Sequence, residues 1–266
     1  MKRALTAVLF AGITSACLVL HEISAVIIIA ILSGLCAFEF YAMLRADAKL
    51  PNELFGTVAA ALYPVMYFIW GSIGMLILTT IFVLVVLIWY VYYTHARITD
   101  VAVTLFGALY TGFMLTSLVT IRGLLPGVWG GLLTFVVVLS VWGNDAFAFW
   151  IGSRFGKHKM APRISPKKSW EGFFAGTVGS IIGWSLALFI PGFDFPWYWV
   201  IIAGLVCGWI GILGDLLESR IKRSTGHKDS GNLLPGHGGF LDRCDSLLTV
   251  APTALLILYI ASMVSS

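Results

Sequence analysis

Long apolar stretches recur along almost the whole chain, separated by short breaks that carry proline, glycine or charge. Each stretch is close to the roughly 20 apolar residues that a helix needs to cross the hydrocarbon core of a bilayer. The pattern predicts an all-α polytopic membrane protein with about nine transmembrane helices. Their predicted ranges are 4–20, 23–43, 54–71, 73–93, 101–120, 128–151, 172–190, 197–217 and 247–264.

The tightest breaks are at His21-Glu22 and at Gly71-Ser72, and the count of helices falls if either pair of segments forms one bent element.

Composition supports the membrane assignment, since 59% of the 266 residues are hydrophobic, 11% are charged, and the mean hydropathy is +0.93. Soluble domains usually carry about a quarter charged residues. We expect a single integral membrane domain over residues 1–266. A cleaved signal peptide is disfavoured, because another apolar segment follows the first at once.

The distribution of Lys and Arg predicts the orientation in the membrane. If the chain crosses nine times, the N-terminus and every second connection share one side, which then holds all seventeen basic residues except Arg122. Cytoplasmic connections carry the excess of Lys and Arg in membrane proteins. We therefore expect a cytoplasmic N-terminus, an external C-terminus, and two polar active-site segments, 144–172 and 214–246, on the cytoplasmic side.

The second polar segment places acids at the ends of two predicted helices. Asp215 and Glu218 are about one helical turn apart, and Asp242 and Asp245 repeat this spacing at the start of the next helix. Carboxylates at membrane depth are costly, so they usually mark a site or an ion pair.

Two interpretations of these acids stay open. In the first, Asp215 and Asp242 simply pair with Arg220 or Arg243. In the second, they hold a hard divalent cation such as Mg²⁺, which proteins bind through one or two carboxylates together with waters and substrate phosphates.

The loop between these acids suits phosphate groups. Its glycines allow the backbone to approach phosphate oxygens closely, and its basic side chains supply fixed positive charge. His237 is expected to donate a hydrogen bond or position a ligand, because no second histidine lies nearby at ligand spacing. The other phosphate-binding candidates here are Lys222, Arg223, Lys228, Gly236, Gly238, Gly239 and Arg243.

The first polar segment offers a second set of candidates. Asp145 is predicted inside the sixth helix, either as a packing carboxylate or as a site residue. The run Ser165-Pro166-Lys167-Lys168-Ser169 places two lysines and two hydroxyls where a phosphate chain could bind, although lysines near a membrane also contact anionic lipid.

These residues resemble a known family. The 27-residue segment SRIKRSTGHKDSGNLLPGHGGFLDRCD, from Ser219 to Asp245, is similar to the signature of the phosphatidate cytidylyltransferase (CDP-diacylglycerol synthase) family. The segment SRFGKHKMAPRISPKKSWEG also resembles that family's other polar region. Cys244, where an aliphatic residue or Thr is expected, and Ser169, where Thr is more usual, are mild departures.

The resemblance implies an enzyme, a nucleotidyltransferase that converts CTP and phosphatidate into CDP-diacylglycerol and pyrophosphate for phospholipid biosynthesis. It also implies Mg²⁺ as the cofactor, a cytoplasm-facing site and a homodimer, and it leaves a second cation open. Asp215 and Asp242 would bind the metal, and Asp245 and Lys167 would join them as catalytic residues. Together with the candidates proposed above from the residues themselves, the predicted substrate-binding residues are Asp145, Ser165, Lys168, Ser219, Lys222, Arg223, Lys228, His237, Gly238, Gly239 and Arg243.

The chemistry agrees with this assignment. The second pKa of a phosphate monoester is about 6, so phosphatidate is mostly dianionic at neutral pH and needs no strong general base. The obstacle is the repulsion between a dianion and a triphosphate, so catalysis should come from positioning and charge neutralisation.

Two other classes stay open. Another membrane transferase could join an activated phosphate to a lipid, but the paired acids of a DxxxD type are absent from the sequence. A transporter for an anionic solute would favour paired similar halves and midplane breaks, whereas the polar groups here gather on one face. We expect no nucleic-acid partner and a place in a bacterial inner membrane.

Overall fold

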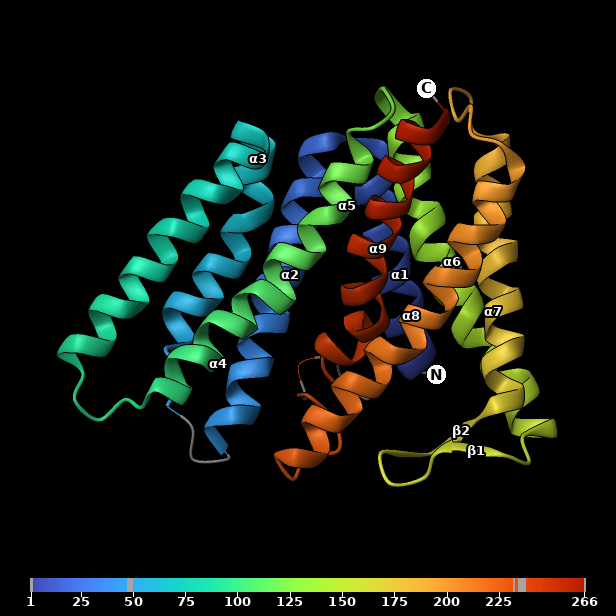
Figure 1. Cartoon of the computed structure of the whole chain (residues 1–266). Helices are drawn as coiled ribbons and strands as arrows, with labels where there is room; N and C mark the ends of the chain where they lie inside the picture. The colour runs from blue at the N-terminus through green and yellow to red at the C-terminus, as the bar shows by residue number, and fades with distance from the viewer. Residues whose placement is uncertain (1, 47–49, 232, 234–237, 266) are drawn as a thin grey trace. The chain divides into compact units, whose positions relative to one another are not determined.

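Figure 1 shows a computed structural model that describes residues 2–46, 50–231, 233 and 238–265. Seven of the described helices are long and apolar enough to cross a membrane, which confirms a polytopic, essentially helical membrane protein. The elements are α1 (Lys2–Leu20), α2 (Glu22–Ala46), α3 (Glu53–Tyr92), α4 (Ile98–Ala108), η1 (Leu109–Phe113), α5 (Met114–Arg122), α6 (Gly127–Phe155), β1 (Lys159–Ala161), β2 (Ser165–Ser169), α7 (Trp170–Ser185), η2 (Leu186–Phe189), α8 (Trp197–Ser224) and α9 (Leu241–Ser265).

Helix α3 folds back on itself at Gly71, as its two arms in Figure 1 show. Gly71 has φ +60° and ψ −144°, a backbone conformation that L side chains rarely adopt. The hydroxyls of Tyr63 and Thr79 lie 3.0 Å apart, although residues 16 positions apart in a straight helix would be separated by about 24 Å. The predicted helices 54–71 and 73–93 are therefore the two arms of one bent element.

The chain divides into two compact units. The first contains Met1–Cys17, Glu22–Thr120 and Lys222–Cys244, and the second contains Leu18–His21, Ile121–Ile221 and Asp245–Ser266. The first unit thus combines the early helices with most of the segment Ser219–Asp245, whose sequence resembles a known family.

Tyr41 holds the helices of the first unit together. Its side chain is fully buried, and its hydroxyl donates a 2.6 Å hydrogen bond to the carbonyl of Thr104 in α4. The ring lies against Gly56 of α3 and Gly107 of α4, where an added Cβ would overlap the phenol. Two glycines are therefore needed for α2, α3 and α4 to meet around one aromatic ring.

Close backbone contacts between glycines shape the second unit. Gly143 of α6 faces Gly179 of α7, so that a Cβ on Gly143 would lie 2.7 Å from the Gly179 carbonyl oxygen. Gly204 of α8 packs on Ile181 of α7 in the same way. Small residues allow such approaches between membrane helices, where packing and not the hydrophobic effect drives association.

Arg122, the one basic residue predicted on the outer face, is buried and 3% exposed. Its guanidinium donates to the carbonyls of Gly127 at 2.8 Å and of Val19 at 3.4 Å. The charged side chain thus ties the connection between α5 and α6 to the end of α1.

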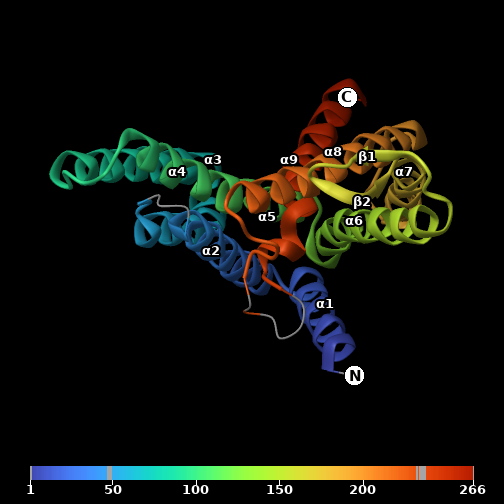
Figure 2. The ribbon, with the colours of Figure 1, turned by 90° about the horizontal axis from the view of Figure 1, so that it is seen from below.

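A β-hairpin joins α6 to α7 in the second unit. Strands β1 and β2 pair antiparallel at the end of the two helices, as Figures 1 and 2 show. Ser169 accepts a 3.2 Å hydrogen bond from the Gly172 amide and thereby caps α7, and His158 lies 2.7 Å from the Glu171 carboxylate. This hairpin, which the sequence pattern did not predict, holds the run Ser165–Ser169 beside the helices.

Candidate active site

A cavity of about 540 Å³ lies in the second unit, bordered by α6, the β-hairpin, α7 and α8. Its volume falls within the range of about 300–1,000 Å³ that is typical of small-molecule sites. The polar side chains that line it are Asp145, Ser153, Lys159, Ser165, Lys167, Lys168, Ser169 and Asp215. The apolar side chains that line it are Ala148, Phe149, Met160, Phe173 and Ile212. The cavity therefore offers both charged and apolar surfaces to a single ligand.

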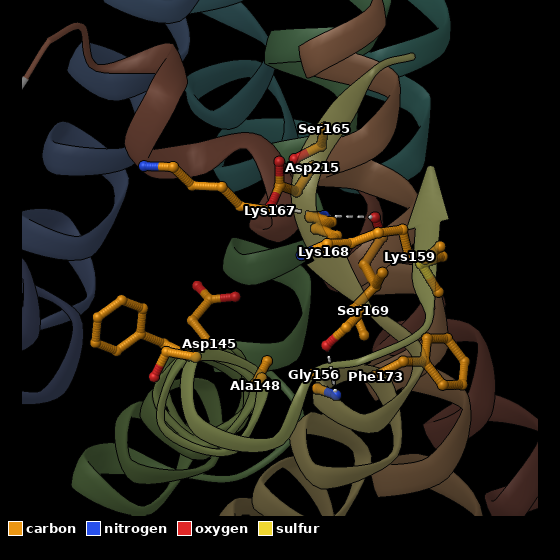
Figure 3. Close-up of a pocket in the computed structure, with 16 residues that line it drawn as sticks. Asp145, Ala148, Gly156, Lys159, Ser165, Lys167, Lys168, Ser169, Phe173 and Asp215 are labelled. Atoms are coloured by element: carbon orange, nitrogen blue, oxygen red, sulfur yellow. Dashed lines mark hydrogen bonds and ion pairs between the residues drawn. The ribbon is translucent and has the colours of Figure 1, made fainter. Parts of the chain in front are cut away.

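Lys168 and Asp215 form an ion pair at this cavity, and Figure 3 shows both side chains there. The Lys168 ammonium lies 2.7 Å from Asp215 Oδ2 and also donates to the Ile212 carbonyl at 3.3 Å. Ser219 donates a 3.2 Å hydrogen bond to Asp215 Oδ1 from one turn further along α8. The two side chains are 20% and 32% exposed, so the pair is held by protein and still open to a ligand.

Three further predicted residues lie at the same cavity. Asp145 is exposed on α6 and its carboxylate projects into the cavity, which does not agree with a carboxylate packed inside the helix bundle (Figure 3). Lys167 is exposed and Ser165 is partly buried on β2. The structure thus brings residues of the first polar segment and Asp215 to one cavity.

Asp245 extends the acidic character of the second unit. It interacts electrostatically with Asp215, Glu218 and Asp145, which come from α8 and α6. Glu218 itself is fully buried. Carboxylate oxygens are the kind of ligand that a hard cation such as Mg²⁺ prefers.

Asp242 anchors the signature loop inside the first unit. Its Oδ1 lies 2.6 Å from the Lys222 ammonium, and its Oδ2 accepts a 2.8 Å hydrogen bond from the Gly239 amide. The Ser230 amide donates to both oxygens, at 3.2 and 3.0 Å. Because an ionised carboxylate offers about four acceptor positions, these partners use most of its capacity.

Both predicted metal ligands are therefore ion-paired, Asp215 with Lys168 and Asp242 with Lys222. Asp242 belongs to the first unit and Asp215 to the second, so each acid is placed only within its own unit. Across the described ranges, no three His, Cys, Asp or Glu side chains gather closely enough to hold a metal ion by themselves. Mg²⁺ does not require such a cage, because substrate phosphates and waters complete its shell.

Glu39 is the residue that sequence reasoning missed. It lies within α2, is 2% exposed, and its Oε2 accepts hydrogen bonds from the Ser230 hydroxyl and the Leu241 amide, each at 2.9 Å. The only signal in the sequence was an acid inside a predicted membrane helix, which could pair with any neighbouring helix.

The remaining predicted residues lie in or beside the loop between α8 and α9. Arg223 donates to the His227 carbonyl at 3.4 Å, while Lys228 and Arg243 are exposed. Gly238 has φ +78°, and Gly239 is buried against Ser230 and Glu39. His237 and its neighbours 234–236 lie outside the described residues.

The apolar helices define a polytopic membrane protein, and acids, lysines and phenylalanines line one of its cavities. The chain belongs to the cytidylyltransferase family, whose sequence model matches residues 1–261. The family predicted from the loop between Ser219 and Asp245 is thereby confirmed.

Curated relatives are similar to about half of the chain. The phosphatidate cytidylyltransferase of Bacillus subtilis (strain 168) is 37% identical over 155 residues, which are 58% of this chain and 57% of that protein. That of Brucella abortus biovar 1 (strain 9-941) is 41% identical over 154 residues, 58% and 55% of the two chains. That of Pseudomonas aeruginosa is 42% identical over 132 residues, 49% and 48% of the two chains. The chain thus spans about half the length of the curated relatives it matches.

Proposed function

We propose that this protein transfers a cytidylyl group from CTP to phosphatidate, giving CDP-diacylglycerol and pyrophosphate. The observation that carries the proposal is the cavity of the second unit, where Lys167 and the Lys168–Asp215 pair share one space with Phe149 and Phe173. A lipid phosphate has the same two characters, an anionic head and apolar chains. Membership of the cytidylyltransferase family supports the same reaction.

The chain's own residues would act by positioning and neutralising charge. Lys167, Lys168 and the hydroxyl of Ser165 would take phosphate oxygens at the cavity, which lowers the repulsion between the two anionic substrates. The attacking phosphate is already ionised at neutral pH, so no side chain has to remove a proton from it. The reaction therefore depends on the angle and distance at which the lysines hold the two substrates.

We propose Asp215 and Asp242 as the residues that hold Mg²⁺, with Asp245 beside Asp215 as a further acid of the site. When bound, Mg²⁺ would neutralise charge on the triphosphate. Lys168 and Lys222 pair with the two acids and thereby orient their carboxylates. Arg223, Lys228 and Arg243 would add positive charge for the pyrophosphate and for the lipid head.

We also propose nine membrane crossings, with a cytoplasmic N-terminus and site in a bacterial inner membrane. The seven apolar helices support this count if the two arms of α3 cross separately and α1 crosses as well. The bias of Lys and Arg supports the orientation. A homodimer and a second cation remain parts of the proposal that the family resemblance suggests.

The test is pyrophosphate release by the detergent-purified protein, with CTP, phosphatidate and Mg²⁺ each omitted in turn and with CDP-diacylglycerol measured by mass spectrometry. We expect both products only when all three are present. Folded protein that yields neither product, or that releases pyrophosphate without phosphatidate, would refute the proposed reaction. Movement of an anionic solute across vesicles without pyrophosphate release would favour the transporter class.

A further inference from the structure

Glu39 lies deep in the first unit, seven residues before the end of α2. At 1.5 Å per residue this is about 10 Å from the helix end. Its side chain is only 2% exposed. A buried carboxylate is costly unless hydrogen bonds or charges compensate for the lost water, so the contacts of Glu39 indicate why it is there.

The Glu39 carboxylate caps a helix other than its own. Oε2 accepts a 2.9 Å hydrogen bond from the amide of Leu241, the first residue of α9. The first amides of a helix have no partner within the helix, and a negative charge beside them is also favoured by the helix dipole. A residue of α2 therefore provides the acceptor for the first amide of α9.

Ser230 connects Glu39 to Asp242. The Ser230 hydroxyl donates to Glu39 Oε2 at 2.9 Å and accepts from the Asp242 amide at 3.3 Å. The Ser230 amide in turn donates to the Asp242 carboxylate. One hydrogen-bonded network thus runs from Glu39 through a single serine to the proposed metal ligand.

Two glycines let the Glu39 carboxylate pack directly against the loop backbone. A Cβ on Gly231 would lie 2.6 Å from Glu39 Oε1, and a Cβ on Gly239 would overlap both Glu39 Oε2 and the Ser230 hydroxyl. The Gly239 amide also donates to Asp242 Oδ2 at 2.8 Å. The Glu39 carboxylate thus lies directly against the same backbone that donates to Asp242.

We propose that Glu39 is a positioning residue, which sets the orientation of Asp242 through Ser230, Gly239 and the first turn of α9. This inference rests on the proposed role of Asp242 in the reaction. Within the described residues Glu39 Oε1 has no hydrogen-bond partner, so the hydrogen bonds of this carboxylate are those that Oε2 accepts. The carbonyl oxygen of Gln can accept the same two hydrogen bonds, whereas Ala offers none.

The experiment compares Glu39→Ala and Glu39→Gln with a matched control, Asp100→Ala. Asp100 is an acid of the same unit, 1% exposed, that accepts hydrogen bonds from the amides of Leu50 at 3.0 Å and Arg97 at 2.8 Å. Its removal breaks two comparable hydrogen bonds at a different loop. It therefore reports what a purely structural loss does to the enzyme.

We expect Glu39→Ala to raise the half-saturating Mg²⁺ concentration for pyrophosphate release about tenfold, because residues that orient a metal ligand typically affect affinity by about 10- to 100-fold. The KM for phosphatidate should stay within about twofold. Glu39→Gln should restore the Mg²⁺ dependence to within about threefold of wild type. Asp100→Ala should lower the unfolding temperature and leave the Mg²⁺ dependence unchanged.

Two measurements are independent of turnover. Hydrogen exchange followed by mass spectrometry should show faster exchange over residues 238–246 in Glu39→Ala, and wild-type exchange there in Asp100→Ala. Electron paramagnetic resonance of Mn²⁺ should show weaker binding to Glu39→Ala alone. If Glu39→Ala does not fold, Glu39→Asp, which is one methylene shorter, replaces it.

Wild-type exchange over residues 238–246 in Glu39→Ala would overturn the inference. An equal loss of Mg²⁺ response in Asp100→Ala would overturn it too, because the effect would then be general destabilisation. If the wild-type protein releases no pyrophosphate, the proposed function fails instead, and hydrogen exchange alone decides the role of Glu39.

Discussion

Replacing Asp242 with Asn separates the structural role of this acid from its chemical role. Oδ1 faces the Lys222 ammonium at 2.6 Å, and Oδ2 accepts from the Gly239 amide at 2.8 Å. Asn keeps one oxygen, so its NH₂ group must face either Lys222 or the Gly239 amide. Whichever way the side chain turns, two donors meet.

The structure sets the size of the effect. The Lys222 and Asp242 side chains are only 13% and 9% exposed, so water cannot readily replace a lost partner. A hydrogen bond to a charged group contributes about 1.5–3 kcal/mol, and a buried donor left without an acceptor costs a similar amount. We expect Asp242→Asn to lower the free energy of unfolding by about 2–3 kcal/mol and to reduce activity by at least about 10²-fold.

The double variant Lys222→Met with Asp242→Asn provides the control. Without the ammonium, the Asn NH₂ group can occupy the vacated side while its oxygen still accepts from Gly239 and Ser230. We expect the double variant to recover at least about 1 kcal/mol relative to Asp242→Asn and to remain inactive. Unfolding in detergent and pyrophosphate release measure the two quantities. A single variant within about 0.5 kcal/mol of wild type, or one that keeps half its activity at saturating Mg²⁺, would refute this reasoning.

Three further predictions concern the two units. In a double-mutant cycle, Lys168→Met and Asp215→Asn should couple by about 1–2 kcal/mol, since their 2.7 Å ion pair is partly buried; additive effects on unfolding would contradict this. Lys167→Ala should raise the KM for one phosphate-bearing substrate, and unchanged KM values for both substrates would exclude its proposed contact. Gly239→Ala should destabilise by at least about 2 kcal/mol because its Cβ would overlap Glu39, whereas Gly12→Ala, with nothing within 4 Å, should be neutral or slightly stabilising in thermal unfolding.

The helices could be predicted because a bilayer imposes a long apolar run on every crossing. Each of the nine predicted ranges falls largely on helix, including the two arms of α3 on either side of Gly71. The β-hairpin could not be predicted in the same way. Its strands are three and five residues long, mostly polar, and β2 contains Pro166, so no alternation marks them.

The candidate site could be predicted as a set of residue types, but not as a set of contacts. Asp215 and Asp242 stood out because acids at membrane depth need a reason to be there. Their partners Lys168 and Lys222 lie 47 and 20 positions away and could not be selected among several nearby basic residues. Glu39 and Ser230 are separated by 191 positions along the sequence. Nothing in the sequence of α2 indicates which distant amide Glu39 caps.

The separation between Glu39 and its partners also has a consequence for biosynthesis. Ser230 and Leu241 follow Glu39 by 191 and 202 residues. At a synthesis rate of about 5–20 residues per second, α2 is made roughly 10–40 s before its acid can meet either donor. During that interval the nascent helix carries a carboxylate whose insertion into a membrane is costly, and the apolar residues of the helix must outweigh that cost. The first unit can therefore finish folding only after the ribosome has made most of the second.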